Sequence, residues 1–133
     1  MKDSRSKIQD SKTVKARASF VHNSPRKLRL VLDAVRGLAP TDAIANLKML
    51  PQRAAKPILD VMQQAVGNAK NNFSISPADL VVTSAQILEG PRIAKKADVH
   101  AHGARFDRGV RRKKLAHIVI ELSEKGEDRG AKS

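Results

Sequence analysis

The sequence predicts an α+β fold in which three helices lie between strands and a long β-hairpin protrudes from the domain. Apolar residues alternate near both ends of the chain, recur at helical spacing in the middle, and are scarce in a basic segment between the last two strands. The length of 133 residues suits one domain. We place it at residues 14–124, between a flexible basic tail at 1–13 and a disordered tail at 125–133.

The first strand is predicted from Val14 onward. Ala16, Ala18 and Phe20 alternate with charged and polar residues there, which is typical of a strand with one buried face. We therefore expect these three side chains to point toward the core.

The first helix is predicted between Ser24 and Arg36. Ser24 is a good N-cap, Pro25 suits the first helical position, and Gly37 is a stop signal. Its apolar face is expected to consist of Leu28, Val31, Leu32 and Val35.

Two further helices follow. Thr41 is the expected N-cap of the second, and Pro51 ends it; Ile44, Leu47 and Leu50 are its inward positions. The third pattern runs from Ala55 to Ala69 with Pro57 inside it, so this helix either bends at Pro57 or begins near it.

The last two strands, "LVVTSAQIL" and "LAHIVIEL", bracket residues 89–114. Strands that follow one another in the sequence most simply pair antiparallel, so this segment becomes a hairpin extension that leaves the domain. It contains nine Lys or Arg against three acids, and only Val99, Phe106 and Val110 are sizeable apolar side chains between Lys95 and Lys114. Such a ribbon is marginal by itself. We expect surrounding phosphates to replace the core that it lacks.

The charge balance narrows the partner. A formal net charge of +13 attracts polyanions, so a nucleic acid, an anionic membrane or an acidic protein is expected. The N-terminus lacks the apolar run of a signal peptide, and no later run is long enough to span a bilayer. A membrane-surface helix would carry bulky aromatic anchors, whereas this chain has 3 Phe, no Tyr and no Trp. We therefore expect no membrane partner.

A candidate anion site lies at the start of the first helix. Arg26, Lys27 and Arg29 cluster around its N-terminal turn, where backbone N–H groups and the helix dipole also favour an anion. The alternative is an ordinary solvated helix face. Binding is favoured because cations are unfavourable to a helix N-terminus and the segment offers no acid to offset them.

Catalysis and metal binding are not expected. The chain has no Cys, no carboxylate pair on one face and no Gly-rich phosphate loop, so we predict neither an enzyme nor a cofactor. Asp98, His100 and His102 would share one face of a strand, but two His without a further clustered ligand make a poor metal site. His22 and His117 are interpreted as surface or phosphate-contacting side chains.

Four segments, in order and spacing, carry a family resemblance: "NSPRKLRLVLDAVRG", "AIANLKMLPQRAAKPILDVMQQAVGNAKNN", "LEGP" and "HIVIEL". They resemble the bacterial large-subunit ribosomal protein numbered twenty-two, from about Ala16 to Leu122. The resemblance implies a small antiparallel sheet packed on three helices with a long hairpin. It also implies a cytoplasmic component of the large ribosomal subunit that binds 23S rRNA, supports assembly and contacts neighbouring large-subunit proteins. The hairpin would line the exit tunnel beside the nascent polypeptide.

Carried over to this chain, the resemblance implies rRNA contacts on the helices and the hairpin. The tip departs from the family pattern, with Val99-His100 before Ala101-His102-Gly103 and Ala104-Arg105 after it. His100, His102 and Arg105 are therefore the candidates that reach the tunnel. The full set of rRNA-binding candidates is Ser24, Arg26, Lys27, Arg29, Arg36, Lys56, Asn68, Asn71, Asn72, Arg92, Lys95, Lys96, Arg105, Arg108, Arg111, Arg112, Lys113 and Lys114.

An alternative function is a nucleoid-type, sequence-tolerant DNA-binding protein, since a basic β-arm can also enter a duplex groove. Dimeric proteins of that kind need an apolar face for self-association. Here each helix has one apolar stripe, which the domain itself uses, so we do not expect a homo-oligomer. Competition between a structured large-subunit RNA and duplex DNA would discriminate the two functions.

Overall fold

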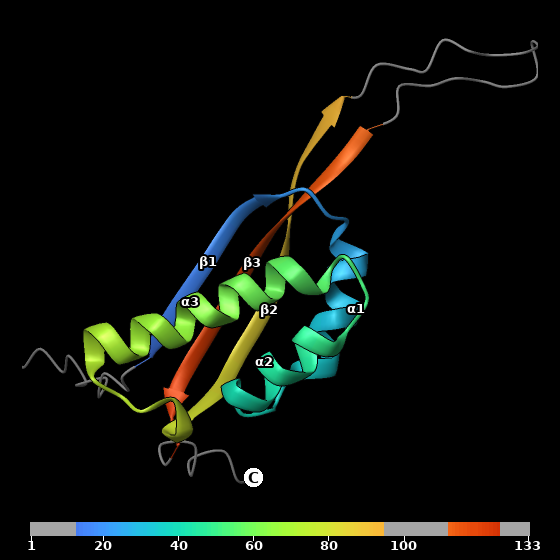
Figure 1. Cartoon of the computed structure of the whole chain (residues 1–133). Helices are drawn as coiled ribbons and strands as arrows, with labels where there is room; N and C mark the ends of the chain where they lie inside the picture. Colours follow the sequence, from blue (N-terminus) through green and yellow to red (C-terminus); the bar gives the residue numbers. More distant parts are fainter. Residues whose placement is uncertain (1–12, 95–111, 126–133) are drawn as a thin grey trace, which may run out of the picture.

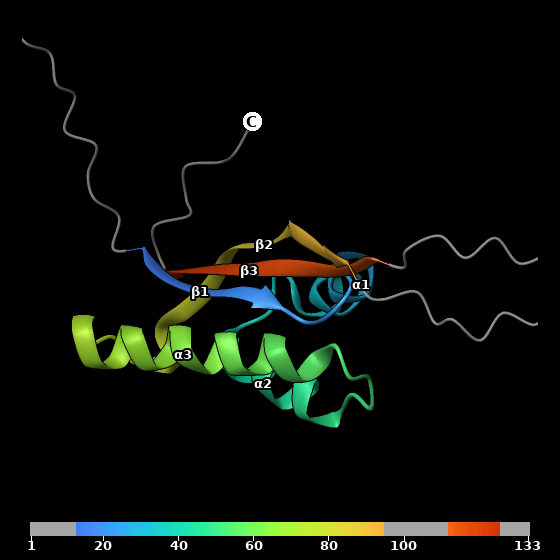
Figure 2. The same cartoon turned by 90° about the horizontal axis from the view of Figure 1, so that it is seen from above.

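A computed structural model of the chain describes residues 13–94 and 112–125, which form a three-stranded antiparallel sheet and three α-helices. The strand order is β1-β3-β2, so the last strand lies in the middle. Figure 2 shows the sheet as one layer with α2 and α3 beneath it. The predicted α+β class is confirmed. The elements are β1 (Val14–Val21), α1 (Pro25–Val35), α2 (Pro40–Met49), α3 (Ala55–Phe73), the 3-10 turn η1 (Pro77–Asp79), β2 (Leu80–Ala94) and β3 (Arg112–Glu124).

The core lies between the helices and one face of the sheet. The four predicted apolar positions of α1 are all buried, and on β3 the alternating residues Ala116, Ile118, Ile120 and Leu122 are each 0% exposed. Helix α3 runs along β1 and contributes its own apolar stripe, which includes Ile58. Both periodicities read from the sequence are therefore confirmed.

The starts of the helices follow their prolines. Pro25 is the first residue of α1 and Ser24 holds the N-cap position, although the Ser24 side chain makes no capping hydrogen bond. The prediction that Thr41 caps α2 is wrong, because Pro40 already adopts the first helical position and Ala39 precedes it. Pro57 lies in the first turn of α3, where its missing N–H is not needed. That helix therefore begins near Pro57, as one of the two predicted alternatives required.

Strand β1 is confirmed over Val14–Val21, but the inward direction predicted for Phe20 is wrong. The pairing of β1 with β3 shifts between Ala18 and Val21, and Phe20 has a positive φ of 57° and is 57% exposed. Its backbone N–H donates to His117 Nδ1 at 3.0 Å, and its ring meets the imidazole edge to face. The bulge thus replaces a ladder bond with a side-chain bond and turns Phe20 outward.

The predicted pairing of the last two strands is confirmed over its described part. β2 and β3 pair antiparallel from Leu80↔Glu124 to Ala94↔Arg112, and the ribbon leaves the body of the domain (Figure 1). A bulge occurs between Glu89 and Arg92. A Cβ at Gly90 would lie 3.0 Å from the backbone C and O of Leu115, so the close strand approach requires glycine there.

Three predicted segments lie outside the described residues: most of the two tails, and the distal hairpin at 95–111.

Candidate nucleic-acid interface

The N-terminus of α1 and the base of the hairpin border the same hollow. This hollow has a volume of about 320 Å³ and is lined by Ser24, Pro25, Arg26, Arg29, Glu89 and Lys114. Three cations from two elements therefore meet beside a helix N-terminus, where unpaired backbone N–H groups favour an anion. Among the described residues, Arg26 and Lys114 form no ion pair. The geometry suits a phosphate.

The α1 segment contributes no acid to this site, but another element does. No acidic residue lies in the first turn of α1, as predicted, but Glu89 of β2 lines the hollow. One carboxylate beside Arg26, Arg29 and Lys114 leaves the hollow with a net positive charge. The approach of Glu89 could not be predicted from local sequence, because Glu89 lies far from α1 along the chain.

Arg29 and Arg36 are exposed to solvent, and each also forms a hydrogen bond within the protein. Arg36 donates from a guanidinium nitrogen to the carbonyl oxygen of Ala85 at 2.9 Å, and Arg29 donates to that of Ile87 at 3.4 Å. Arg36 also pairs with Asp33 at 3.2 Å. Because β2 is an edge strand, these arginines cover carbonyl groups that would otherwise stay unpaired. Each guanidinium has further donors for an RNA contact.

The candidates on α3 are spread along the helix. Lys56 is exposed in its first turn, close to α1, whereas Asn71 and Asn72 are exposed near its other end. Fifteen residues of helix separate Lys56 from Asn71, a distance of about 20 Å at the usual rise. Asn68 donates to the carbonyl oxygen of Lys15 at 3.4 Å and so ties α3 to β1. Only Lys56 therefore joins the cations around α1.

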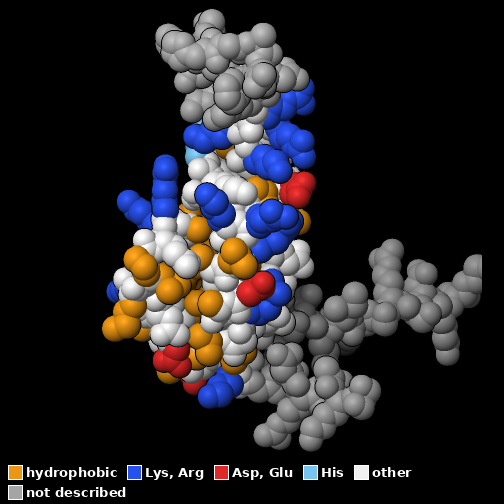
Figure 3. Space-filling model, turned by 90° about the vertical axis from the view of Figure 1, so that its right-hand side faces the viewer, with side chains coloured by type: hydrophobic (Ala, Val, Ile, Leu, Met, Phe, Trp, Pro, Cys, Tyr) orange, Lys and Arg blue, Asp and Glu red, His pale blue; other side chains and the backbone are white. Residues whose placement is uncertain are grey.

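The described base of the hairpin carries one cation on β2 and three on β3. Arg92 lies directly opposite Lys114 in the ladder, and Arg112 and Lys113 are exposed beside them. Like charges that face each other across a strand pair are unfavourable. Figure 3 shows Lys and Arg side chains gathered toward the hairpin base on this side of the molecule. The remaining hairpin candidates lie outside the described residues: Lys95, Lys96, Arg105, Arg108, Arg111 and the tip residues His100 and His102.

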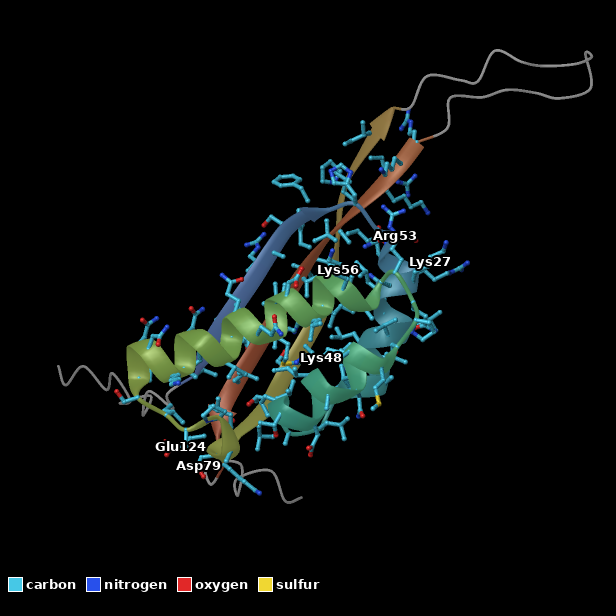
Figure 4. The ribbon with its side chains drawn as sticks, viewed as in Figure 1. Lys27, Lys48, Arg53, Lys56, Asp79 and Glu124 are labelled. Carbon is cyan, nitrogen blue, oxygen red and sulfur yellow. The ribbon has the colours of Figure 1, made fainter. Side chains whose placement is uncertain are left out.

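The charges are separated along the domain. Figure 4 shows Lys27, Arg53 and Lys56 at the end from which the hairpin leaves, and Asp79 and Glu124 at the opposite end. Arg53, which lies in the loop before α3, was not among the predicted RNA-binding residues. Its position just ahead of the Ala54-Ala55-Lys56 helix start was the available signal, since an exposed cation there has no role in the core.

His117 has a structural role that the sequence did not reveal. Its imidazole accepts a hydrogen bond from the Phe20 backbone N–H.

Within residues 13–94 and 112–125, no three His, Asp or Glu side chains gather as metal ligands. The considered trio Asp98, His100 and His102 lies outside those ranges. In the described part of the chain, every helix is too short or too polar to span a membrane.

Comparison with known proteins agrees with this arrangement of elements. The model of the family "Ribosomal protein L22p/L17e" matches residues 16–123. The large ribosomal subunit protein uL22 of Heliobacterium modesticaldum is 38% identical over 116 residues, which cover 87% of this chain and 80% of that protein. The family match begins within β1, ends near the end of β3 and includes the residues that line the cationic hollow.

Proposed function

Because this chain belongs to the ribosomal protein L22p/L17e family, we propose that it binds 23S rRNA, supports large-subunit assembly and lines the polypeptide exit tunnel with its hairpin. The family is a structural, non-enzymatic one. The chain is accordingly a constituent of the large ribosomal subunit, which lies in the cytoplasm of bacteria. Family membership gives no support to the alternative of a nucleoid-type DNA-binding protein.

The observation that carries the RNA-binding proposal is the hollow shared by α1 and the hairpin base. Arg26, Arg29 and Lys114 approach it from two elements, and the free N–H groups of α1 adjoin it. A phosphate there would contact the helical body and the hairpin at the same time. RNA binding would therefore fix the direction in which the ribbon leaves the domain.

The proposed role of the hairpin follows from its charge. Arg92, Arg112, Lys113 and Lys114 repel one another unless anions lie between and around them. Ribosomal RNA packed around both arms would remove this repulsion. From its base the segment is long enough to reach on the order of 35 Å, at about 3.3 Å per residue. We assign tunnel and nascent-chain contacts to His100, His102 and Arg105.

Neighbouring large-subunit proteins and the monomeric state complete the proposal. The apolar stripes of the helices are buried in the domain itself, so within residues 13–94 and 112–125 the helices leave little apolar surface for a second copy. Met49 on α2 and Ile93 on β2 are exposed apolar side chains on separate elements. Contacts with neighbouring proteins are expected to be small and secondary to the RNA contacts.

The test measures binding of the full chain to a 23S rRNA transcript over a range of salt concentrations. The Arg26→Gln, Lys114→Gln double variant is expected to make the slope of log affinity against log salt shallower by about two, one for each lost phosphate contact. The matched control is Lys48→Gln with Lys125→Gln, away from the hollow. An unchanged slope in the first variant, or equal competition by duplex DNA at the same phosphate concentration, would refute the proposal.

A further inference from the structure

A second, larger hollow lies on the other side of the α1 N-terminus. Its volume is about 510 Å³, within the range of small-ligand sites. The turn before α1, the outer face of α1 and the loop between α2 and α3 line it, and its apolar lining, Leu30 with Val31 and Ala54, is called its floor here. Lys27 and Arg53, which Figure 4 shows at the same end of the domain, come from two of these elements.

The floor of this hollow is apolar although it is open to solvent. Leu30 lines it and is 71% exposed on the outer face of α1, next to the buried side chains of Val31 and Ala54. An exposed leucine on a helix is ordinary by itself. Here it is part of the lining of a concave site that also contains Lys27 and Arg53, which is the kind of surface on which a flat, uncharged group would lie.

The rim of the hollow offers cations and amides but no carboxylate. Lys27 and Arg53 form no ion pair, and the side-chain amides of Asn23 and Gln52 form no hydrogen bond, within residues 13–94 and 112–125. None of the lining residues is acidic. The two smaller hollows differ, since one contains Asp33 and the other Glu89.

This combination indicates more than a phosphate site. A phosphate needs cations and N–H donors, but it gains nothing from an apolar floor. A nucleobase needs a flat apolar contact, and its edge needs groups that both donate and accept hydrogen bonds, as Asn and Gln amides do. Arginine also stacks on bases through its guanidinium plane. One nucleotide would therefore use the whole hollow, with its phosphate on Lys27 and Arg53 and its base on Leu30.

We propose that this hollow binds a single unstacked nucleotide of the ribosomal RNA, with the base over Leu30 and its edge read by Asn23 and Gln52. The inference rests on the proposed function and extends it, because it gives a mainly backbone-reading protein one base-specific contact. The sequence did not predict such a contact, since it offers few aromatic platforms. The hollow combines an aliphatic floor with the guanidinium of Arg53 and the imidazole of His22.

The experiment is chemical probing of base edges in a 23S rRNA transcript bound by the full chain. Leu30→Ser removes the floor without changing charge, and Met49→Ser is its control, because Met49 is 85% exposed and does not line the hollow. We expect one base that the wild type and Met49→Ser protect, and that Leu30→Ser leaves reactive. Affinity should fall by about fivefold to tenfold with Leu30→Ser, with an unchanged salt slope.

A second variant, Arg53→Gln, separates the base from the phosphate. It is expected to expose the same base and also to make the salt slope shallower by about one. If Leu30→Ser and Met49→Ser give the same protection pattern, or if only Arg53→Gln changes it, the hollow holds a phosphate alone and the inference is overturned while rRNA binding stands. If the wild type protects no base and duplex DNA competes equally, the proposed function fails and takes the inference with it.

Discussion

The two halves of β3 differ in burial and in charge. From Ala116 to Leu122, alternate side chains are completely buried under the helices, whereas Arg112, Lys113 and Lys114 are exposed cations, the last of which lies opposite Arg92. The first half is stabilised by burial within the chain. The second half has no such source of stability, and its charges become favourable only beside an anion. One continuous strand thus joins a region that is buried in the domain to a region whose cations we propose to contact rRNA.

The largest expected effect tests the self-sufficient half. Ile120→Ala removes a side chain that is 0% exposed in the middle of β3, so it should lower the free energy of unfolding by about 3 kcal/mol through lost burial and a cavity. The matched variant Ile93→Ala, on the ribbon, removes a side chain that is 46% exposed and should cost under about 1 kcal/mol. Urea denaturation measures both, and equal losses would contradict the contrast between the halves.

The junction between the halves is tested by a pair of glycines. Gly90→Ala should destabilise the chain by about 1–2 kcal/mol, because the added Cβ would press on the Leu115 backbone. Gly67→Ala, inside α3, meets no atom within 4 Å and should stabilise it by about 0.5–1 kcal/mol. Thermal denaturation followed by circular dichroism shows whether each variant lowers or raises the stability of the chain. A neutral Gly90→Ala would mean that the strands separate easily at the bulge.

Arg36 tests which cations contribute to the stability of the fold and which do not. Arg36→Met keeps the aliphatic stem but loses the hydrogen bond to Ala85 and the pair with Asp33, and should cost about 1 kcal/mol. Lys27→Met on the same helix is the control and should leave the free energy of unfolding within about 0.5 kcal/mol of wild type. Equal values in urea denaturation would show that the Arg36 contacts add nothing to stability.

The smallest expected effect on stability concerns the ribbon itself. Arg92→Glu places an acid opposite Lys114, so the free protein should gain about 0.5 kcal/mol while the salt slope of 23S rRNA binding becomes shallower by at least about one. Arg92→Gln separates the lost cation from the new ion pair, since it should weaken binding without the full gain in stability. Stronger RNA binding by Arg92→Glu would show that this position faces away from phosphates.

Burial patterns made the fold predictable, and the departures have local causes. The helices, the alternating strand around Ile118 and the antiparallel hairpin all follow from periodicity and from proline and glycine positions. Thr41 was a wrong cap because its neighbour Pro40 suits the first helical position better. Phe20 was placed inward because a bulge, which depends on His117 from the far end of the chain, leaves no mark on local alternation.

The candidate site was predictable in its charges but not in its geometry. Arg26 and Lys114 could be selected as cations, yet only the folded chain brings them around one hollow. The hydrogen bonds of Arg29 and Arg36 to β2 depend on which strand lies at the sheet edge, which the sequence did not predict. Arg53 is exposed ahead of a helix start, but only the folded chain brings it to the same hollow as Lys27.

The separation of charge between the two ends of the domain has a kinetic consequence. With Lys27, Arg53 and Lys56 at one end and Asp79 and Glu124 at the other, the molecule has a permanent electric asymmetry along its length. A negatively charged particle would turn it during diffusion, so that most first encounters occur with the basic end leading. Productive collisions would then outnumber those expected from random orientations, and added salt would remove this advantage before any contact forms.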